Sequence, residues 1–531
     1  MVSQLVLLGG ILLASAWLLL FMRRIKSKPT PTLSLPPSPP ALPLVGHLHL
    51  LKPLVHQALH ELQIKYGPLM HLRLGSTNMV VASTPELAKE LLKTNELAYC
   101  ARPMSIAINL VTYDNAAFAF APYNTYWRFI KKLSNTELLG ARTIRQFCPG
   151  RASEIHRFIK DLMDKSMTGE SVNLTQELMK LSGNVISRMM LSIQSTGTDR
   201  QAEEARNLAR EVTQIFGEFN VADFIKICKT LDVQGFRKRA VDLHKRFDAF
   251  LERIISAREE SRKQQKASVK AEDGPDQDGE EKVRDFLDIL LDVAEDESSE
   301  VSLTRNHVKA LILDFFTAGT DTTATAVEWT VSELIKNPRV LKKAQEEVDR
   351  VTEQKRLINE SDIPNLPYIN AIVKEIMRLH PPVAMINRQG TQDCVVSGYL
   401  IPKGTFLFVN VWAMGRDPKI WQSPLEFAPE RFLEGKQSGL DVKGHHYELL
   451  PFGSGRRGCP GQPLAMRELP VVIGALIQCF TWKPLDSDGK IIADGKTINM
   501  DERPGLTAPR ANDLLCIPVA RFNPFDGFLQ V

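Results

Sequence analysis

One of the seven cysteines lies in a setting that could make it a metal ligand. Cys459 follows a run of glycines in PFGSGRRGCPG, residues 451–461. Such a loop can bring backbone close to a flat ligand and point several N–H groups at one sulfur. Arg456 and Arg457 favour a thiolate, and the helical pattern of 462–480 places the cysteine before a helix N-terminus, where negative charge is stabilised. These features indicate an anionic sulfur ligand for iron; the alternative is an inert cysteine in a glycine turn.

The spacing within this loop favours the ligand interpretation. The residues fit the pattern F-x-x-G-x-R-x-C-x-G, which would occur by chance in a chain of this length on the order of 10⁻⁴ times. The five fixed positions are Phe452, Gly455, Arg457, Cys459 and Gly461. Over about residues 36–520 the sequence resembles the cytochrome P-450 superfamily of haem-thiolate monooxygenases. The resemblance implies that Cys459 is the axial thiolate of haem b, which favours O–O cleavage.

A second group of residues that could do chemistry lies in a predicted long helix, residues 303–336, whose middle is apolar on nearly all faces. Its threonines interrupt that pattern. The Thr322 hydroxyl can donate to the carbonyl of Ala318, and Gly319 can let the helix widen there into a groove for O₂. Asp321 and Thr322 can then relay protons. The alternative is a threonine-rich kink with a solvent-facing aspartate, but the segment matches the family's oxygen-activation motif A-G-x-D-T.

The resemblance implies further haem contacts and a structural cluster. The haem contacts are Trp127, Lys131, Arg388, Phe452, Arg457 and Gly461. Lys131 stands where the family has arginine, so the bidentate contact of arginine is lost there. Glu375 and Arg378 are three residues apart on a predicted helix and can face each other; on a surface such a pair contributes ~0–1 kcal/mol. The family buries this pair and links it to the arginine of a P-E-R-F segment, here Arg431.

The elements that must position these residues are predicted to be mostly helical. Apolar residues recur at helical spacing in 86–95, 153–166, 236–257 and 339–352. Short strands are predicted at Leu69–Leu74, 79–82, Cys394–Val396 and 405–410. We therefore expect a mainly α fold with small β-sheets, the cytochrome P-450 fold, in one catalytic domain over residues 44–531. Residues 258–284 are dense in charge and are predicted to form an exposed, mobile connector.

The amino end is predicted to be a membrane anchor followed by a hinge. Residues 5–22 carry no charge and approach the ~20 residues that cross a bilayer as a helix. The basic residues follow this run and no A-x-A site appears, which argues against a cleaved signal peptide and keeps the body cytosolic. We expect residues 1–28 to anchor the chain as a single span in the endoplasmic reticulum membrane. The seven prolines of 29–43 favour a semi-rigid hinge over an SH3 or WW ligand.

Composition excludes several other classes. With 531 residues, 44% hydrophobic and 24% charged, the chain can bury a large core and is not disordered. The net charge is +4, and residues 1–28 contain four basic residues and no acid, so the remainder sums to 4 − 4 = 0. This argues against nucleic acid as a partner. The seven cysteines are odd in number and include no C-x-x-C pair, so neither a disulfide framework nor a zinc finger is predicted.

The resemblance extends to a functional subfamily of plant microsomal members. Segments 212–225, 310–324 and 502–519 are similar to flavonoid-modifying enzymes, which include flavone synthase II, flavanone 2-hydroxylase and isoflavonoid synthases, with the best match to flavone synthase II. This implies conversion of a flavanone to a flavone by hydrogen abstraction at C2, followed by desaturation or 2-hydroxylation. Electrons would come from NADPH through a partner reductase, with cytochrome b5 as a further candidate.

Other functions stay open at this point. Within oxygen chemistry they are flavanone 2-hydroxylation, an isoflavonoid-type synthesis, or oxidation of another plant secondary metabolite. Outside it they are an oxygen-independent haem-thiolate isomerase and a haem-binding protein. The presence of both Asp321 and Thr322 favours oxygen chemistry.

A flavanone is flat and apolar, so its pocket should be mostly apolar with few polar anchors. By family position, the candidate walls come from the segment before Trp127, the roof, the central helix, the segment after the E-x-x-R helix, and the C-terminal region. They are Met104, Ile106, Ile108, Phe120, Phe216, Phe219, Leu313, Phe316, Ala318, Val383, Ala384, Met385, Leu506 and Thr507.

Overall fold

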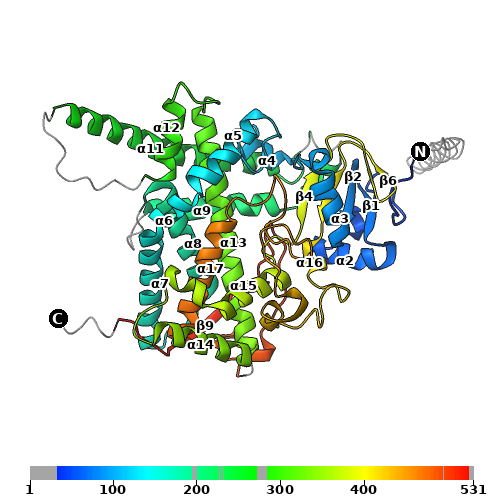
Figure 1. Cartoon of the computed structure of the whole chain (residues 1–531). Coiled ribbons are helices and arrows are strands. Elements are labelled where there is room, and N and C mark those ends of the chain that lie inside the picture. Colours follow the sequence, from blue (N-terminus) through cyan, green and yellow to red (C-terminus); the bar gives the residue numbers. More distant parts are fainter. Residues whose placement is uncertain are drawn as a thin grey trace, which may run out of the picture.

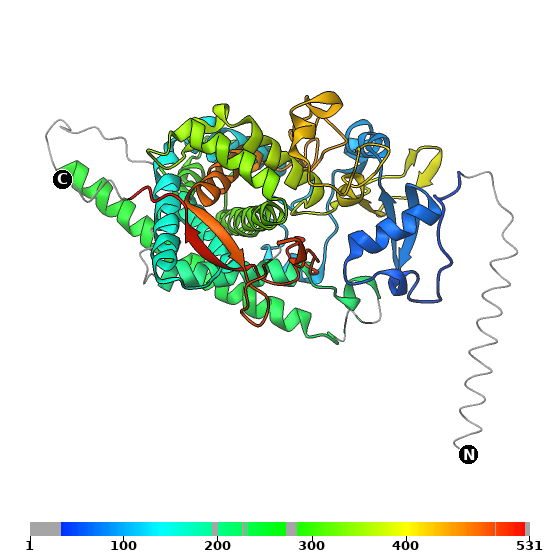
Figure 2. The ribbon, with the colours of Figure 1, turned by 90° about the horizontal axis from the view of Figure 1, so that it is seen from below.

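The computed structural model describes residues 33–193, 200–225, 228, 230, 232–271, 284–493 and 495–525. A strand-rich part, blue and yellow, lies beside a larger helical part, and the long green helix α11 (Phe236–Ala271) projects beyond the helical part in both views (Figures 1 and 2). The predicted mainly α fold with small sheets is confirmed.

The remaining α-helices are α2 Val55–Tyr66, α3 Pro85–Lys89, α4 Ile106–Val111, α5 Thr125–Leu133, α6 Ala141–Gln146, α7 Cys148–Thr168, α8 Leu174–Leu191, α9 Arg200–Gly217, α10 Val221–Phe224, α12 Phe286–Glu295, α13 Arg305–Lys336, α14 Pro338–Thr352, α15 Pro367–Leu379, α16 Val411–Met414 and α17 Gln462–Cys479. Shorter helical turns are η1 Leu48–Leu50, η2 Glu90–Thr94, η3 Glu96–Tyr99, η4 Ser134–Leu138, η6 Glu360–Asn365, η7 Pro429–Phe432, η8 Gly435–Gln437 and η9 Gly495–Thr497. The strands are β1 Leu69–Leu74, β2 Thr77–Ala82, β3 Val172–Asn173, β4 Ile386–Gln389, β5 Cys394–Val396, β6 Tyr399–Ile401, β7 Phe406–Val409, β8 Phe480–Pro484 and β9 Leu515–Ala520.

The larger sheet positions one of the predicted haem contacts. Its strand order is β1-β2-β7-β4, with β2 parallel to β7 and β4 antiparallel to β7. Along β4, Ile386 and Arg388 are buried while Asn387 and Gln389 are only partly buried. This alternation follows from the period of two in a strand. It turns Arg388 to the buried side of the strand, where its Nη2 donates to Arg457 O at 3.4 Å. Strands β3, β9 and β8 form a separate sheet.

Helix α13 runs through the helical part as an uninterrupted α-helix and packs along α8. Where the two helices meet, a Cβ on Gly319 would lie 2.5 Å from Ile186 Cδ1, so a larger residue would force the Ile186 side chain to shift. Gly319 is thus tightly packed against α8, and the widening of the helix at this residue stays a prediction. The helix stays regular there while its threonines donate to carbonyls one turn back, as Thr320 does to Phe316 at 2.8 Å.

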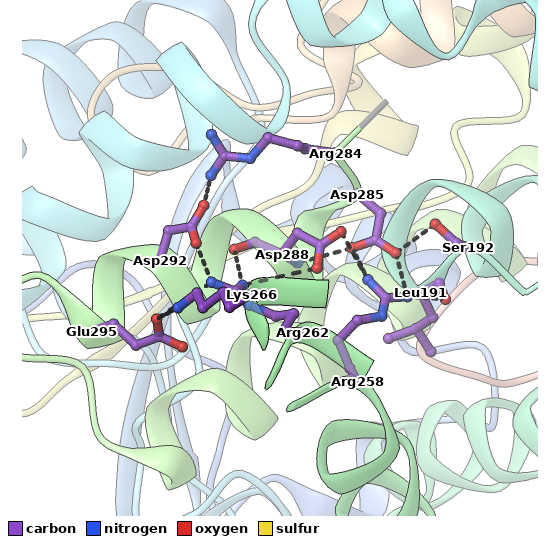
Figure 3. A network of polar contacts seen from close by, with 10 residues as sticks. All are labelled: Leu191, Ser192, Arg258, Arg262, Lys266, Arg284, Asp285, Asp288, Asp292 and Glu295. Atoms are coloured by element: carbon purple, nitrogen blue, oxygen red, sulfur yellow. Dashed lines mark hydrogen bonds and ion pairs between the residues drawn. The ribbon is translucent and has the colours of Figure 1, made fainter. Parts of the chain in front are cut away.

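The first part of the expected connector, residues 258–271, is helical and not an exposed loop. Residues 258–271 continue α11, and Arg258 donates to Asp285 Oδ1 at 2.8 Å. One turn on, Arg262 pairs with acidic residues of α12 (Figure 3). Basic residues that suggested a solvent-exposed segment are thus paired with acidic residues at the start of α12 and along it. The rest of the expected connector, 272–283, lies outside the described residues.

The structure describes only part of the amino-terminal region to which the predictions apply. In the part of the chain that the structure describes, no helix has the length and apolar character that crossing a bilayer demands. The expected anchor, residues 1–28, lies outside that part. Of the expected hinge, 29–43, the portion from Ser34 on is attached to the body, since Leu400 N donates to Ser34 O at 3.0 Å. Any free spacer must therefore end before Ser34.

Candidate active site

The glycine-rich loop closes around Cys459. Its backbone N–H donates to Phe452 O at 2.9 Å, and Gly455 takes a left-handed φ of 68° where a Cβ would lie 2.3 Å from Glu96 Oε1. Helix α17 begins at Gln462, and the N–H groups of Gly461 and Gln462 are both directed at the cysteine sulfur. The loop thus presents a sulfur already surrounded by donors that stabilise negative charge.

The Cys459 side chain borders an internal space. It is exposed, yet burial raises the pKa of its thiol, while the N–H groups of Gly461 and Gln462 and the charge of Lys131 lower that pKa. A side chain that is accessible and still enclosed by protein must face a hollow within the fold. Ala318 is exposed in the same way in the middle of the otherwise buried α13.

Three arginines without carboxylate partners among the described residues lie at this space: Arg388 and Arg457 are buried, and Arg102 is half-buried. Burial lowers the pKa of Arg102 and of Arg457 to about 10 and also lowers the pKa of Arg388, and the charge of Arg102 lowers the pKa of the other two. None of them forms an ion pair with a carboxylate of the described residues, and Arg102 Nε has no partner there. Arg457 instead donates to the Cys100 carbonyl at 2.8 Å. Such a cluster is suited to an anionic ligand, which would compensate its charge.

The residues fit the haem that the sequence implies. The charges of Cys459 and of Asp314 on α13 both act on Arg102, so sulfur, arginines and central helix border one region. A thiolate ligand on one side and two propionates among the arginines would satisfy both the sulfur and the unpaired cations. Arg102 was missed by sequence reasoning, because nothing in its neighbourhood marks it apart from other arginines.

Trp127 and Lys131 lie four residues apart on α5, and both approach the cysteine loop. The indole of Trp127 donates to Phe118 O at 3.1 Å, and the Arg457 guanidinium lies 4.4 Å from its ring centroid. Lys131 Nζ donates to Gly458 O at 2.9 Å, next to the cysteine. Burial lowers the pKa of Lys131 while the nearby sulfur opposes that shift. Lys131 thus acts on the cysteine loop through charge.

One stripe of α13 faces the internal space. Asp314, Ala318 and Thr322 follow at four-residue spacing, which places them on one helix face, and Thr322 Oγ1 donates to Ala318 O at 2.8 Å, as predicted. Asp314 accepts from Ala119 N at 2.8 Å, and burial raises its pKa to about 7. Sequence analysis missed Asp314, although a carboxylate in an apolar helix one turn before Ala318 was a usable signal.

Two of the predicted pocket residues point elsewhere. Leu313 and Phe316 are 1% and 2% exposed and pack in the main hydrophobic core. At 3.6 residues per turn they lie about 140° and 160° around the helix from Ala318. Both were therefore wrongly placed in the pocket, because a helix that is apolar on all faces does not reveal which face meets the ligand.

The other candidate wall residues are spread over several surroundings. Phe120 and Phe216 contact each other edge to face at 5.7 Å. Phe219 is half exposed and stacks on Phe224 at 5.3 Å, and Met385 packs against the sheet-side core. The half-buried ones are Met104, Ile106 and Ile108; the exposed ones are Val383 and Leu506; the buried ones are Ala384 and Thr507.

The structure brings the predicted structural cluster together. Arg378 Nε and Nη2 each donate to Glu375 at 2.8 Å, and Arg431 Nε donates to the same carboxylate at 3.1 Å. The Arg378 guanidinium also donates to the carbonyls of Pro424 and Glu426 at 2.7 and 3.1 Å. One buried carboxylate thereby ties α15 to the long segment that leads into the cysteine loop.

Comparison with known proteins shows which family and which solved structures the chain is similar to. The family described as Cytochrome P450 matches residues 36–508. The chain is 66% identical to cytochrome P450 93B16 of Glycine max over 96% of both chains. It is 47% identical to a 2-hydroxyisoflavanone synthase of Glycyrrhiza echinata, over 93% of this chain and 94% of the other. A solved zebra fish cytochrome P450 with progesterone shares the fold, with a TM-score of 0.68 and 24% identity over 87% of this chain and 99% of that one.

Proposed function

The chain belongs to the cytochrome P450 family, and on that premise we propose that it is a plant monooxygenase that converts flavanones to flavones. The observation that carries the haem-thiolate chemistry is the enclosed Cys459 beside three arginines that have no carboxylate partner among the described residues, and beside the Thr322 face of α13. The flavonoid substrate is supported by the resemblance of 212–225, 310–324 and 502–519 to flavonoid-modifying enzymes. A relative named 2-hydroxyisoflavanone synthase, 47% identical, supports the same class.

Each part of the site has a task in this reaction. Cys459 would ligate the iron, while Arg102, Arg388 and Arg457 would hold the propionates. When bound, the haem supplies the activation of O₂. The residues of α13 supply protons: Asp321 accepts them from the surroundings, and the Thr322 hydroxyl, already oriented by Ala318 O, passes them on.

The overall reaction balances without a further reactant. A flavanone loses the hydrogens at C2 and C3 and gains the C2–C3 double bond. One O₂ receives these two hydrogens with two electrons from NADPH and two protons, and leaves as two waters. The electrons reach the site through a partner reductase, and cytochrome b5 is a second candidate donor.

Incubation with a flavanone panel tests this assignment. We expect the membrane-bound protein, with reductase and NADPH, to convert naringenin to apigenin, detected by mass as the loss of two hydrogens. A Cys459→Ser preparation is the matched control and should give none. A product one oxygen heavier identifies 2-hydroxylation, and an isoflavone-type product identifies aryl migration. Turnover of non-flavonoids alone would refute the substrate class and leave the monooxygenase chemistry standing.

We also propose that residues 1–28 anchor the enzyme in the endoplasmic reticulum membrane with the catalytic domain in the cytosol. Deleting them should release much of the protein from microsomes, because an apolar span of this length holds a protein in the bilayer. Haem incorporation should stay intact, because the span is not part of the catalytic domain. Sedimentation and the absorbance spectrum of the CO-bound reduced protein measure the two effects. Failure of the shortened protein to take up haem would make the segment part of the folded body.

A further inference from the structure

The C-terminal hairpin, residues 502–510, brings Thr507 to the central helix. The Thr507 hydroxyl donates to Asp321 Oδ2 at 2.5 Å, across 186 residues of sequence. Thr507 is 6% exposed, so water hardly competes for this bond. Among the described residues, Thr507 is the sole hydrogen-bond donor to the Asp321 carboxyl. The orientation of that carboxyl therefore depends on this hydroxyl.

Contacts on two sides hold the hairpin in place. Trp329 of α13 donates from Nε1 to Ala508 O at 2.9 Å, and Ala508 N donates to Pro382 O at 2.9 Å. On another side the end of α9 lies directly against the hairpin, where a Cβ on Gly217 would lie 2.2 Å from Leu506 N. Thr507 is thus a preorganised donor, and little rearrangement is needed for it to act.

At the base of the hairpin, the Glu502 carboxyl stays ionised over the working pH range. The backbones of Glu502 and Arg510 form an isolated β-bridge. The Glu502 carboxylate accepts hydrogen bonds from Trp412 Nε1 at 2.9 Å and from His56 Nε2 at 2.5 Å. Burial opposes ionisation, but these hydrogen bonds and the charge of Arg416 lower the pKa of Glu502 to about 2. A pH effect near neutrality at the tip of the hairpin therefore does not arise from Glu502.

Few charged groups face Asp321. Burial raises the pKa of its carboxyl, and the Thr507 hydroxyl, Arg503 of the hairpin and Arg210 of α9 lower it. Its neighbour Thr322 donates to a carbonyl of its own helix and not to the carboxyl. The hydroxyl of Thr507 is consequently the one neutral group that favours the ionised form of Asp321 among the described residues.

We propose that Thr507 is a positioning residue that orients the Asp321 carboxyl for proton delivery. The inference rests on the proposed monooxygenase function and replaces the earlier expectation that Thr507 is a substrate contact, because its hydroxyl is already committed to Asp321. A hydrogen bond to the charged form of an acid holds that form in place and lowers its pKa. Loss of the bond should therefore alter both the orientation and the titration of Asp321.

The test compares Thr507→Val, which keeps the shape and removes the donor, with Thr507→Ser, which keeps the donor. We expect Thr507→Val to lower kcat several-fold at constant KM, to divert NADPH into hydrogen peroxide, and to move the pH profile of kcat upward by about one unit. Thr507→Ser should restore the wild-type pH profile. An unchanged profile in Thr507→Val, or a change confined to KM, would refute the positioning role.

A second measurement does not depend on turnover. Because the folded pKa of Asp321 is raised, its protonated form stabilises the folded haem-loaded protein at low pH, and this stability is lost as pH rises through the folded pKa. Thr507→Val should raise that pKa further, so its destabilisation should grow with pH across the same window. In an Asp321→Asn background the effect of Thr507→Val should be independent of pH. A pH-dependent effect that persists in that background would overturn the inference.

The two measurements also separate this inference from the substrate assignment. If no flavanone is turned over, the pH dependence of stability in the Thr507→Val, Asp321→Asn and double variants still reports on the bond between Thr507 and Asp321. These three variants and the wild type form a double-mutant cycle. If flavanones are turned over and the cycle shows no coupling, the proposed function stands and the positioning role fails.

Discussion

Replacing Cys459 by serine is expected to abolish the red-shifted absorption band of the CO-bound reduced protein and all monooxygenase activity. A serine hydroxyl stays neutral at pH 7 and cannot donate electron density to iron as a thiolate does. The N–H groups of Gly461 and Gln462 and the Lys131 charge are arranged around an anionic sulfur. A neutral oxygen would leave these donors without their anion, so the loss should be complete.

Two further variants sharpen that experiment. Cys394→Ser changes a partly buried cysteine in the remote β5–β6 hairpin and should leave the band in place. Cys459→His offers a neutral nitrogen ligand, so it should retain haem while the thiolate band disappears. This pair distinguishes loss of the thiolate from loss of the haem or of the fold. Retention of the band in Cys459→Ser would mean that another residue ligates the iron.

Replacing Glu375 by leucine is expected to destabilise the protein by about 3–5 kcal/mol, because it leaves two arginines with an uncompensated charge in the interior. Glu375 and Arg378 have no exposed side-chain surface, and Arg431 is 8% exposed. The change should appear as a lower urea midpoint of the haem-loaded protein, followed by far-ultraviolet circular dichroism, and as a lower yield of folded protein.

A surface ion pair provides the matched control. Lys52 and Glu61 approach to 2.6 Å but are more than half exposed. Glu61→Leu should therefore change stability by only ~0–1 kcal/mol. Adding Arg378→Leu to Glu375→Leu should recover only part of the loss, since the carbonyls of Pro424 and Glu426 then lose their donor. Equal midpoints for Glu375→Leu and Glu61→Leu would contradict a central role for the buried cluster.

Local patterns in the sequence were sufficient for the features that local interactions determine. The strands Leu69–Leu74 and Cys394–Val396 were predicted with the bounds that the structure has, because alternation and turn residues are read within a few positions. The helix predicted at 303–336 is α13, Arg305–Lys336. The hydrogen bond from Thr322 to Ala318 followed from the geometry of one helical turn.

The sequence by itself therefore determined the cysteine loop, the central helix and the family to which both belong. Tertiary structure alone decided which residues meet across the fold: Arg102 with the sulfur, and Thr507 with Asp321. It also decided that Leu313 and Phe316 face the core and not the internal space. The physical reason is that spacing along the chain encodes short-range hydrogen bonds and helix faces. Contacts between distant segments depend on how those faces pack, which no local pattern records.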